Sequence, residues 1–167
     1  LPNILETQDL INNFVSMLSS TNTIGLDTEF MRIRTYYPKL CLVQISSNSD
    51  AGCIDYLQNN NLNKVWGLIF NPKKLKIIHS ARQDLEIFFL IKNQIPRNIF
   101  DTQIGAALLG YQPQIGIKQL LKDELNTEIS KAETRSDWSK RPLDLKQIEY
   151  AIEDVHHLLD LHNVLEK

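Results

Sequence analysis

The spacing of apolar residues predicts an alternation of helices and strands along the chain. Apolar residues recur every three or four positions over 7–18, which indicates an amphipathic helix. Short apolar runs bounded by turn-forming residues indicate strands at 23–27, 40–46 and 52–55. The last two runs are separated only by the turn-rich residues 47–50, so we expect the three strands to form an antiparallel meander.

The second half of the chain is expected to be mainly helical. A buried strand is predicted at 76–79, Ser80 is the expected N-cap of the helix after it, and a short strand follows through Phe100. Residues 126–141 have weak periodicity and predict a mobile loop. The other predicted helices cover 62–70, 102–109, 117–125 and 145 to the end. This order predicts an α/β protein with a mixed sheet flanked by helices.

Two acidic residues, Asp27 and Glu29, follow the first predicted strand with one residue between them. Side chains two apart in a strand share a face, so both carboxylates should lie at one end of the sheet. Two anions are costly at such close range unless a cation lies between them. Carboxylate oxygens suit Mg²⁺ or Mn²⁺, so the pair predicts a site for such an ion.

Three further residues are candidates for the same site. Asp84 falls in the first turns of the helix after the buried strand, where the helix dipole alone would also favour an acid. Tyr150 and Asp154 are four apart in the last helix and therefore share a helical face. Both border an apolar stripe and are directed towards the domain, although a tyrosine at the core edge beside a solvated aspartate has the same spacing.

Together these five residues resemble the ribonuclease D branch of the DEDD 3′→5′ exonuclease superfamily, in the subtype with a tyrosine in its third motif. Residues 27–30 match the first motif, Asp84 the second, and Tyr150 with Asp154 the third. The likeness covers nearly the whole chain, and further matches occur at 34–40, 101–103, 135–138 and 141–143. One departure is the stretch 81–83, where bacterial relatives often carry smaller or acidic residues; it leaves the acidic positions intact but can alter how the substrate strand is held.

The resemblance implies a ribonuclease H-like fold and stepwise hydrolysis of the 3′-terminal phosphodiester of RNA, with release of nucleoside 5′-monophosphates. The implied substrate is RNA with a free 3′ end, in tRNA 3′-end maturation or stable-RNA turnover, with tRNA precursors as the expected partners. Two divalent cations, Mg²⁺ or Mn²⁺, are the expected cofactors, because cations about 4 Å apart offset the charge of an anionic phosphodiester. Many bacterial members also carry helical C-terminal nucleic-acid-binding domains, which we expect this chain to lack.

Each matched residue has an expected role. Asp27 should bridge both ions. Glu29 and Asp154 should complete the ion on the nucleophile side, and Asp84 should support the ion on the leaving-group side. Tyr150 should orient the attacking water rather than take its proton, because a phenol with a pKa near about 10 is a poor base at neutral pH.

Four residues are candidates for contacting the RNA strand. Phe30 and Ile33 can stack on the terminal base or belong to the core. Gln103 can reach the strand or anchor a helix. Arg141 is a candidate phosphate contact, whereas Trp138, nearby in the same loop, is a candidate core plug.

Length and charge restrict the function only loosely. A chain of 167 residues predicts one exonuclease domain over 1–167. The net charge of −2 argues against broad electrostatic adhesion to nucleic acid. Seven basic residues between Lys64 and Arg97 can nevertheless follow a phosphate backbone or form an ordinary solvated surface. No feature identifies a protein partner.

The apolar runs and the cysteines bear on location. No run approaches the roughly 18 residues that span a bilayer, and the start lacks the features of a signal peptide, so no membrane partner is expected. Cys41 and Cys53 lie in strand-like runs and predict small core residues in a reducing compartment, which indicates a cytoplasmic protein. The first residue, Leu1, indicates a trimmed sequence.

Three other functions remain as alternatives. A DNA exonuclease of the same superfamily shares the carboxylates, although residues 35–38 and 135–143 favour ribonuclease D. A non-catalytic nucleic-acid-binding module can keep the fold, but five intact site residues argue against it. An endonuclease of the ribonuclease H kind is disfavoured by the spacing of Tyr150 and Asp154.

Overall fold

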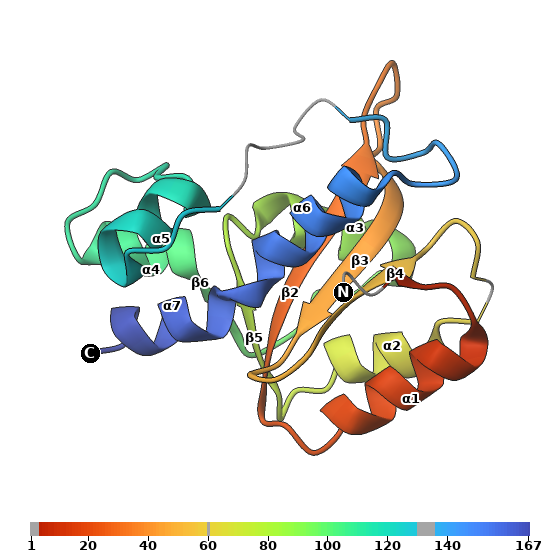
Figure 1. Cartoon of the computed structure of the whole chain (residues 1–167), viewed down its shortest axis with the longest axis horizontal. Coiled ribbons are helices and arrows are strands. Elements are labelled where there is room, and N and C mark those ends of the chain that lie inside the picture. Colours follow the sequence, from red (N-terminus) through yellow and green to blue (C-terminus); the bar gives the residue numbers. More distant parts are fainter. Residues whose placement is uncertain (1–3, 60, 130–135) are drawn as a thin grey trace.

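The computed structural model describes residues 4–59, 61–129 and 136–167 as a mixed sheet flanked by helices (Figure 1). The sheet has six strands in the order β1-β4-β3-β2-β5-β6. The strands are β1 Ile4–Leu5, β2 Thr23–Met31, β3 Lys39–Ser46, β4 Ala51–Asp55, β5 Leu75–Ile78 and β6 Ile99–Asp101. The helices are α1 Gln8–Leu18, α2 Asn63–Ile69, α3 Arg82–Lys92, α4 Thr102–Leu108, α5 Ile117–Leu125, α6 Leu145–His156 and α7 Leu158–Leu165.

The predicted meander forms the centre of this sheet. β2 pairs antiparallel with β3, and β3 pairs antiparallel with β4. The flanking strands β1, β5 and β6 all pair parallel with their neighbours. The parallel pairing of β2 with β5 covers only Thr23 to Gly25, so the longer part of β2 extends past the end of β5.

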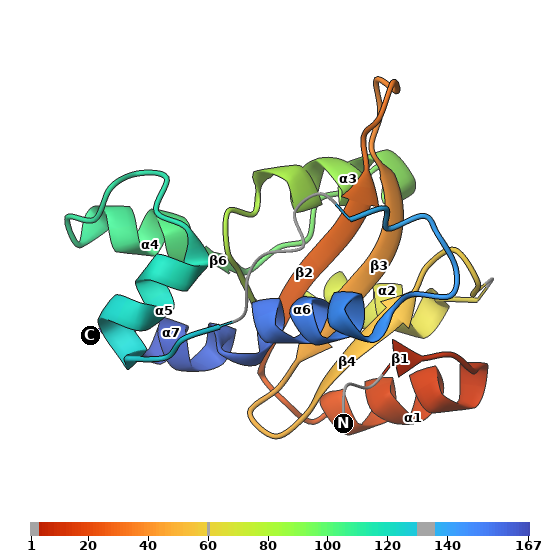
Figure 2. The ribbon, with the colours of Figure 1, turned by 45° about the horizontal axis from the view of Figure 1, so that its top comes forward.

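Helices cover both faces of the sheet (Figures 1 and 2). Apolar side chains of α1, α2 and α3 pack with one face in the main core, which includes Phe14, Trp66 and Phe88. α6 crosses the opposite face and contacts β2, β3 and β4. α7 contacts β2 and β5, and α4 and α5 pack against it at one end of the molecule (Figure 1). No helix in the described ranges is long and apolar enough to cross a membrane.

Most of the predicted elements are confirmed within a few residues. α1 begins after Thr7, whose hydroxyl accepts a hydrogen bond from the backbone of Leu10 and caps the helix. α5 has the predicted limits. Cys41 and Cys53 are both buried and free, as expected of small core residues.

Several limits were wrong. β2 does not stop at Asp27 but continues to Met31, because β3 pairs with it over that length. β1 was missed, since two residues are too short for a periodic signal. The final helix is interrupted at His157, which separates α6 from α7. The loop 126–141 has no helix or strand in its described part, and residues 130–135 lie outside the described residues.

Candidate active site

The central strand β2 places Asp27 and Glu29 on the face of the sheet that α6 covers. Alternation along the strand directs Leu26 and Thr28 to the opposite face, towards α3. Asp27 lies directly opposite Gln44 of β3, and Glu29 lies opposite Leu42. Both carboxylates are partly buried. The predicted pair therefore lies within a long strand beneath a helix, rather than at a strand end.

The helix α6 brings Asp154 to the same place because its backbone comes close to β2. Gly25 permits this approach, since a side chain there would collide with the hydroxyl of Ser46 and lie 3.1 Å from the carbonyl oxygen of Val155. Ser46 donates a 2.6 Å hydrogen bond to that carbonyl, next to Asp154 in sequence. The helix start is fixed by a capping box between Asp144 and Gln147.

Three of the predicted carboxylates converge. Asp27, Glu29 and Asp154 each direct a carboxylate oxygen to a common point, and these oxygens lie within 4.8 Å of one another. They come from two elements that are more than a hundred residues apart in the chain. Within residues 4–59, 61–129 and 136–167 no Lys or Arg forms an ion pair with these three acids. Such a group of oxygen donors is the arrangement that binds a hard divalent metal ion.

Asp84 reaches β2 from the other side of the sheet. β5 ends at Ile78, so the edge of β2 beyond Gly25 has no strand partner on that side. α3 begins there, and Asp84 in its first turn accepts a 2.5 Å hydrogen bond from the hydroxyl of Thr28. Asp84 is buried and is separate from the three converging oxygens, yet its charge acts on Asp27.

The pKa values of all four acids are shifted upwards. Burial raises the pKa of Asp27 well above its usual range, and the charges of Asp84, Asp154 and Glu29 raise it further. Burial, followed by Asp154 and Asp84, raises the pKa of Glu29 to about 9. Burial raises the pKa of Asp84 and of Asp154 to about 6. Without a cation, the cluster therefore retains protons at neutral pH, and a bound cation would displace them.

Tyr150 lies one helical turn before Asp154 and is partly buried. Burial raises the pKa of its phenol, and the charge of Asp154 and a hydrogen bond to it raise that pKa further. The ring packs near Trp138, with centroids 6.1 Å apart. The phenol therefore stays protonated and acts as a hydrogen-bond donor beside the carboxylates, which agrees with an orienting role and not with that of a base.

The two candidates for contact with the terminal base, Phe30 and Ile33, differ in exposure. Phe30 is partly buried and packs against the main core, so the core alternative describes most of its contacts. Ile33 is 66% exposed in the β2–β3 hairpin, so its side chain is open to contact with a ligand.

Two polar candidates are engaged by the protein itself. The side-chain amide of Gln103 donates a 2.9 Å hydrogen bond to the carbonyl oxygen of Ile115, so it anchors α4 to the following loop. Arg141 forms a buried ion pair with Asp55, with Nη2 2.7 Å from Oδ1, and also donates to the carbonyl oxygen of Trp138. The charge of Arg141 is thus neutralised inside the fold, which argues against the predicted phosphate contact. Trp138 is buried, as expected of a core plug.

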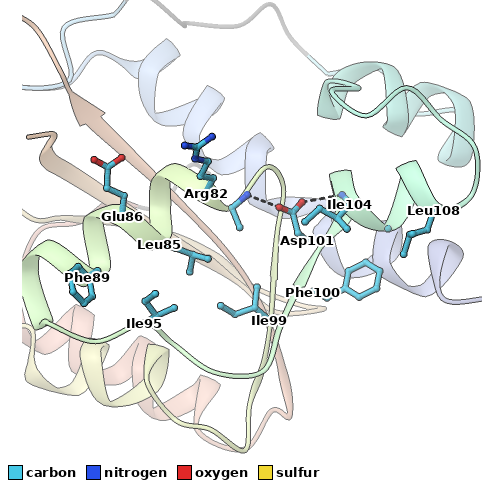
Figure 3. A pocket seen from close by; sticks show the side chains of 12 residues that line it. Arg82, Leu85, Glu86, Phe89, Ile95, Ile99, Phe100, Asp101, Ile104 and Leu108 are labelled. Carbon is cyan, nitrogen blue, oxygen red and sulfur yellow. Dashed lines mark hydrogen bonds between the residues drawn. The ribbon is translucent and has the colours of Figure 1, made fainter.

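A residue whose importance the sequence did not reveal, Asp101, holds the start of two helices. Its carboxylate accepts hydrogen bonds from the amides of Ser80 at 3.0 Å, Ala81 at 2.8 Å and Gln103 at 2.9 Å. Figure 3 shows this carboxylate with the further bond from the amide of Ile104. Ser80 is not the N-cap of α3 as expected: the cap position is Ala81, without a side-chain cap bond, and Ser80 adopts a left-handed backbone conformation with φ of 58°. The only available signal was the match of 101–103 to a family helix start.

An apolar cavity lies away from the carboxylates. It has a volume of about 750 Å³ and lies between α3, β6 and α4, lined by Leu85, Phe89, Ile99 and Ile104 among others (Figure 3). None of the five predicted catalytic residues lines it. The chemistry therefore has to be sought at the polar cluster on β2.

The fold and the site define a class: an α/β protein with an all-carboxylate site for divalent metal ions. More specifically, the chain belongs to the 3′-5′ exonuclease family, whose model matches residues 2–167. Ribonuclease D of Haemophilus influenzae is 42% identical over 152 residues, which cover 91% of this chain and 38% of that protein. Ribonuclease D of Gluconacetobacter diazotrophicus is 38% identical and is covered to 42%, with 98% of this chain aligned.

Solved structures agree with these relatives. Escherichia coli RNase D, described as an exoribonuclease involved in structured RNA processing, has a TM-score of 0.92 and 32% identity; the match covers 98% of this chain and 44% of that one. Brucella melitensis NrnC with bound Mg²⁺ has a TM-score of 0.78 and 27% identity, with 98% and 77% covered. The predicted fold and the resemblance to ribonuclease D are confirmed. The chain spans about two fifths of the length of the curated relatives that it matches.

Proposed function

We propose that this chain is the catalytic part of a 3′→5′ exoribonuclease, which removes nucleoside 5′-monophosphates one at a time from RNA with a free 3′ end. The observation that carries the proposal is the convergence of Asp27, Glu29 and Asp154, with Asp84 and Tyr150 beside them. All five are the residues that the family motifs assign to catalysis. The names of the relatives, ribonuclease D, support RNA as the substrate class.

The residues fit a site for two divalent cations, Mg²⁺ or Mn²⁺. The converging side chains offer only carboxylate oxygens, the donors that these ions prefer, and their mutual repulsion opposes the metal-free charged state. Bound Mg²⁺ in the related NrnC supports the same choice here. When bound, the two ions would activate the nucleophile and offset the charge of the phosphodiester.

The remaining roles fall to side chains of the protein itself. Asp27, Glu29 and Asp154 would hold one ion, while Asp27 and Asp84 would hold the other. Tyr150, protonated at neutral pH, would donate a hydrogen bond that orients the attacking water towards the phosphorus atom. The buried position of the cluster under α6 limits competing solvent.

The β2–β3 hairpin would guide the RNA strand towards the carboxylates. Its connecting loop begins three residues after Glu29, and the hairpin projects from the sheet (Figure 2). Tyr36 and Tyr37 at its tip are 81% and 60% exposed, and Arg34 is exposed beside them. Exposed aromatic rings stack on bases with little dependence on sequence, and arginine attracts phosphate, which suits the end of a single strand. Ile33 would contact the terminal bases from the same hairpin.

The biological substrate and location are part of the proposal. Precursors of tRNA and other stable RNAs are the substrates we expect, in line with structured RNA processing by the Escherichia coli relative. The two buried free cysteines agree with the reducing environment of the cytoplasm.

Incubation with a 3′-tailed tRNA tests the proposal. In Mg²⁺ or Mn²⁺ the tail should shorten by single nucleotides, and the products should be nucleoside 5′-monophosphates. A 3′-phosphorylated tRNA should resist, and excess EDTA should stop the reaction. Internal fragments would instead indicate an endonuclease, faster trimming of single-stranded DNA would indicate a DNA exonuclease, and binding without turnover would indicate a non-catalytic module.

A further inference from the structure

One buried side chain in the described part of the molecule has no hydrogen-bond partner for either of its polar atoms. The amide of Gln44 in β3 is fully inaccessible to solvent, yet neither its oxygen nor its nitrogen is bonded. Buried amides are normally satisfied, because removing one from water without a new partner is costly. Such an exception indicates a polar group that acquires its hydrogen-bond partner in another state of the protein.

Its position identifies the partner. Gln44 lies directly opposite Asp27 in the β2–β3 register, and directly opposite Cys53 in the β3–β4 register. Residues paired across a sheet share a face, with Cβ atoms about 5 Å apart. Glu29, Asp27 and Asp154 all raise the pKa of the Cys53 thiol, whose first cause is burial, so the same carboxylates also influence the strand beyond Gln44. The amide therefore lies between the thiol and the metal-binding cluster.

We infer that Gln44 is a positioning residue for Asp27: its amide N–H group donates to the Asp27 carboxylate when the site holds a metal ion. This inference rests on the proposed function. An ionised carboxylate accepts several hydrogen bonds, and Asp27 has one from the backbone of Thr28. The neutral amide of Gln44 lies across the strand from Asp27 and can supply a further donor without adding charge.

Hydrophobic packing alone does not account for a glutamine at this place. The adjoining buried positions on the same face of β3 are Leu42, which is apolar, and Ser46, which bonds to α6. An apolar residue of similar volume would fill the position of Gln44 without leaving two unsatisfied atoms. The cost is offset only if the amide acquires a partner in a state that the protein uses.

The test compares Gln44→Met with the wild type, because methionine keeps the length and flexibility of the side chain but removes the amide. Calorimetric titration with Mn²⁺ alone should give an affinity about 10–100-fold weaker in the variant, the usual effect of removing a group that orients a metal ligand. In excess EDTA the variant should melt at the same temperature as the wild type or higher, because an unpaired amide has been removed.

Gln147→Met is the matched control. Gln147 is a second buried glutamine, but its side-chain oxygen accepts a 3.1 Å hydrogen bond from the amide of Asp144 in the capping box of α6. Its replacement should lower the melting temperature in EDTA. If Gln44→Met destabilises the metal-free protein as Gln147→Met does, or binds Mn²⁺ as the wild type does, Gln44 is an ordinary core residue.

The wild-type protein offers a measurement that does not depend on folding of a variant. The side-chain amide NMR signals of Gln44 should shift when Mg²⁺ is added and reach an end point as the site saturates. Signals that stay fixed at saturating Mg²⁺ would overturn the inference. Absence of any Mn²⁺ or Mg²⁺ binding to the wild type would instead contradict the proposed function.

Discussion

Two buried groups of charged side chains on the α6 side of the sheet differ in whether the fold itself neutralises them. At Asp55 the chain provides its own cation: Arg141 pairs with both carboxylate oxygens, and the amides of Leu57 and Gln58 donate to Oδ1. At Asp27 the chain provides further anions, and the pKa values of the acids rise. The first group is neutralised within the fold, whereas the second is left for a ligand to neutralise.

This difference distinguishes a structural charge from a functional one. Arg141 and Asp27 both lie in motifs that resemble the same family, Asp27 as a predicted metal ligand and Arg141 as a candidate phosphate contact. The ion pair with Asp55 distinguishes Arg141 from Asp27, since a buried ion pair with all its hydrogen bonds made has no capacity left for a substrate. A buried cluster of like charge has stability to gain from binding a cation. The following predictions test that division, in order of effect.

Asp27→Asn should have the largest effect on turnover. The change weakens both ion sites. Bound metal lowers the free energy of the transition state by several kcal/mol, so the rate should fall about 10³-fold or more. Metal-free stability should rise, because one of the repelling acids becomes neutral. Single-turnover assays and melting in EDTA measure the two effects. A near-normal rate would remove Asp27 from the site.

Tyr150→Phe should slow the reaction by roughly 10²–10⁴-fold, the range for a positioned catalytic group, with Mn²⁺ affinity nearly unchanged. The substitution removes one hydrogen-bond donor and keeps the ring that packs near Trp138. Single-turnover rates of the wild type and the variant at saturating Mn²⁺ measure this loss of rate. Equal rates in the two proteins would make Tyr150 a core residue.

Arg141→Met should instead act on stability. It leaves Asp55 buried without its cation, which costs about 3–5 kcal/mol in the free energy of unfolding. Urea denaturation measures the loss, and adding Asp55→Asn should recover part of it. The rate per folded molecule should stay the same. A lower rate with unchanged stability would show that Arg141 contacts RNA, as its motif originally indicated.

The smallest effect is a pH dependence of the metal-free protein. The cluster's folded-state pKa values lie above the unfolded ones, so its contribution to stability is fully present below about pH 4 and is lost as pH rises through about 6 for Asp84 and Asp154 and about 9 for Glu29. In EDTA, the melting temperature should therefore fall between about pH 5 and about pH 9. Asp27→Asn or saturating Mn²⁺ should reduce this fall, and an identical slope in all three samples would contradict it.

Much of the fold and the carboxylate site followed from local patterns. Apolar periodicity located α1 and α5, and alternation with turn residues located the meander. Resemblance to the short family motifs identified Asp27, Glu29 and Asp154, which the structure brings within reach of one ion. These succeeded because each signal is contained in a few consecutive residues.

Other features depend on partners distant in sequence. β2 runs to Met31 because β3 pairs with it, which no pattern within β2 records. Arg141 is neutralised by Asp55, 86 residues away, and the isolation of Gln44 depends on what surrounds it in three dimensions. A side chain's type limits the bonds that it can make, but only the tertiary structure decides which of them are made.

Asp101 has a consequence for how tolerant this protein is of mutation. Its single carboxylate fixes the turn before α3 and the first turn of α4. The start of α3, the helix that carries Asp84, is therefore held in position by a residue outside the metal cluster. A genetic screen for inactive variants would therefore recover Asp101 along with the catalytic acids. The two kinds of defect would differ in rescue: higher metal concentration can restore a weakened ligand, but it cannot return a displaced helix to its place.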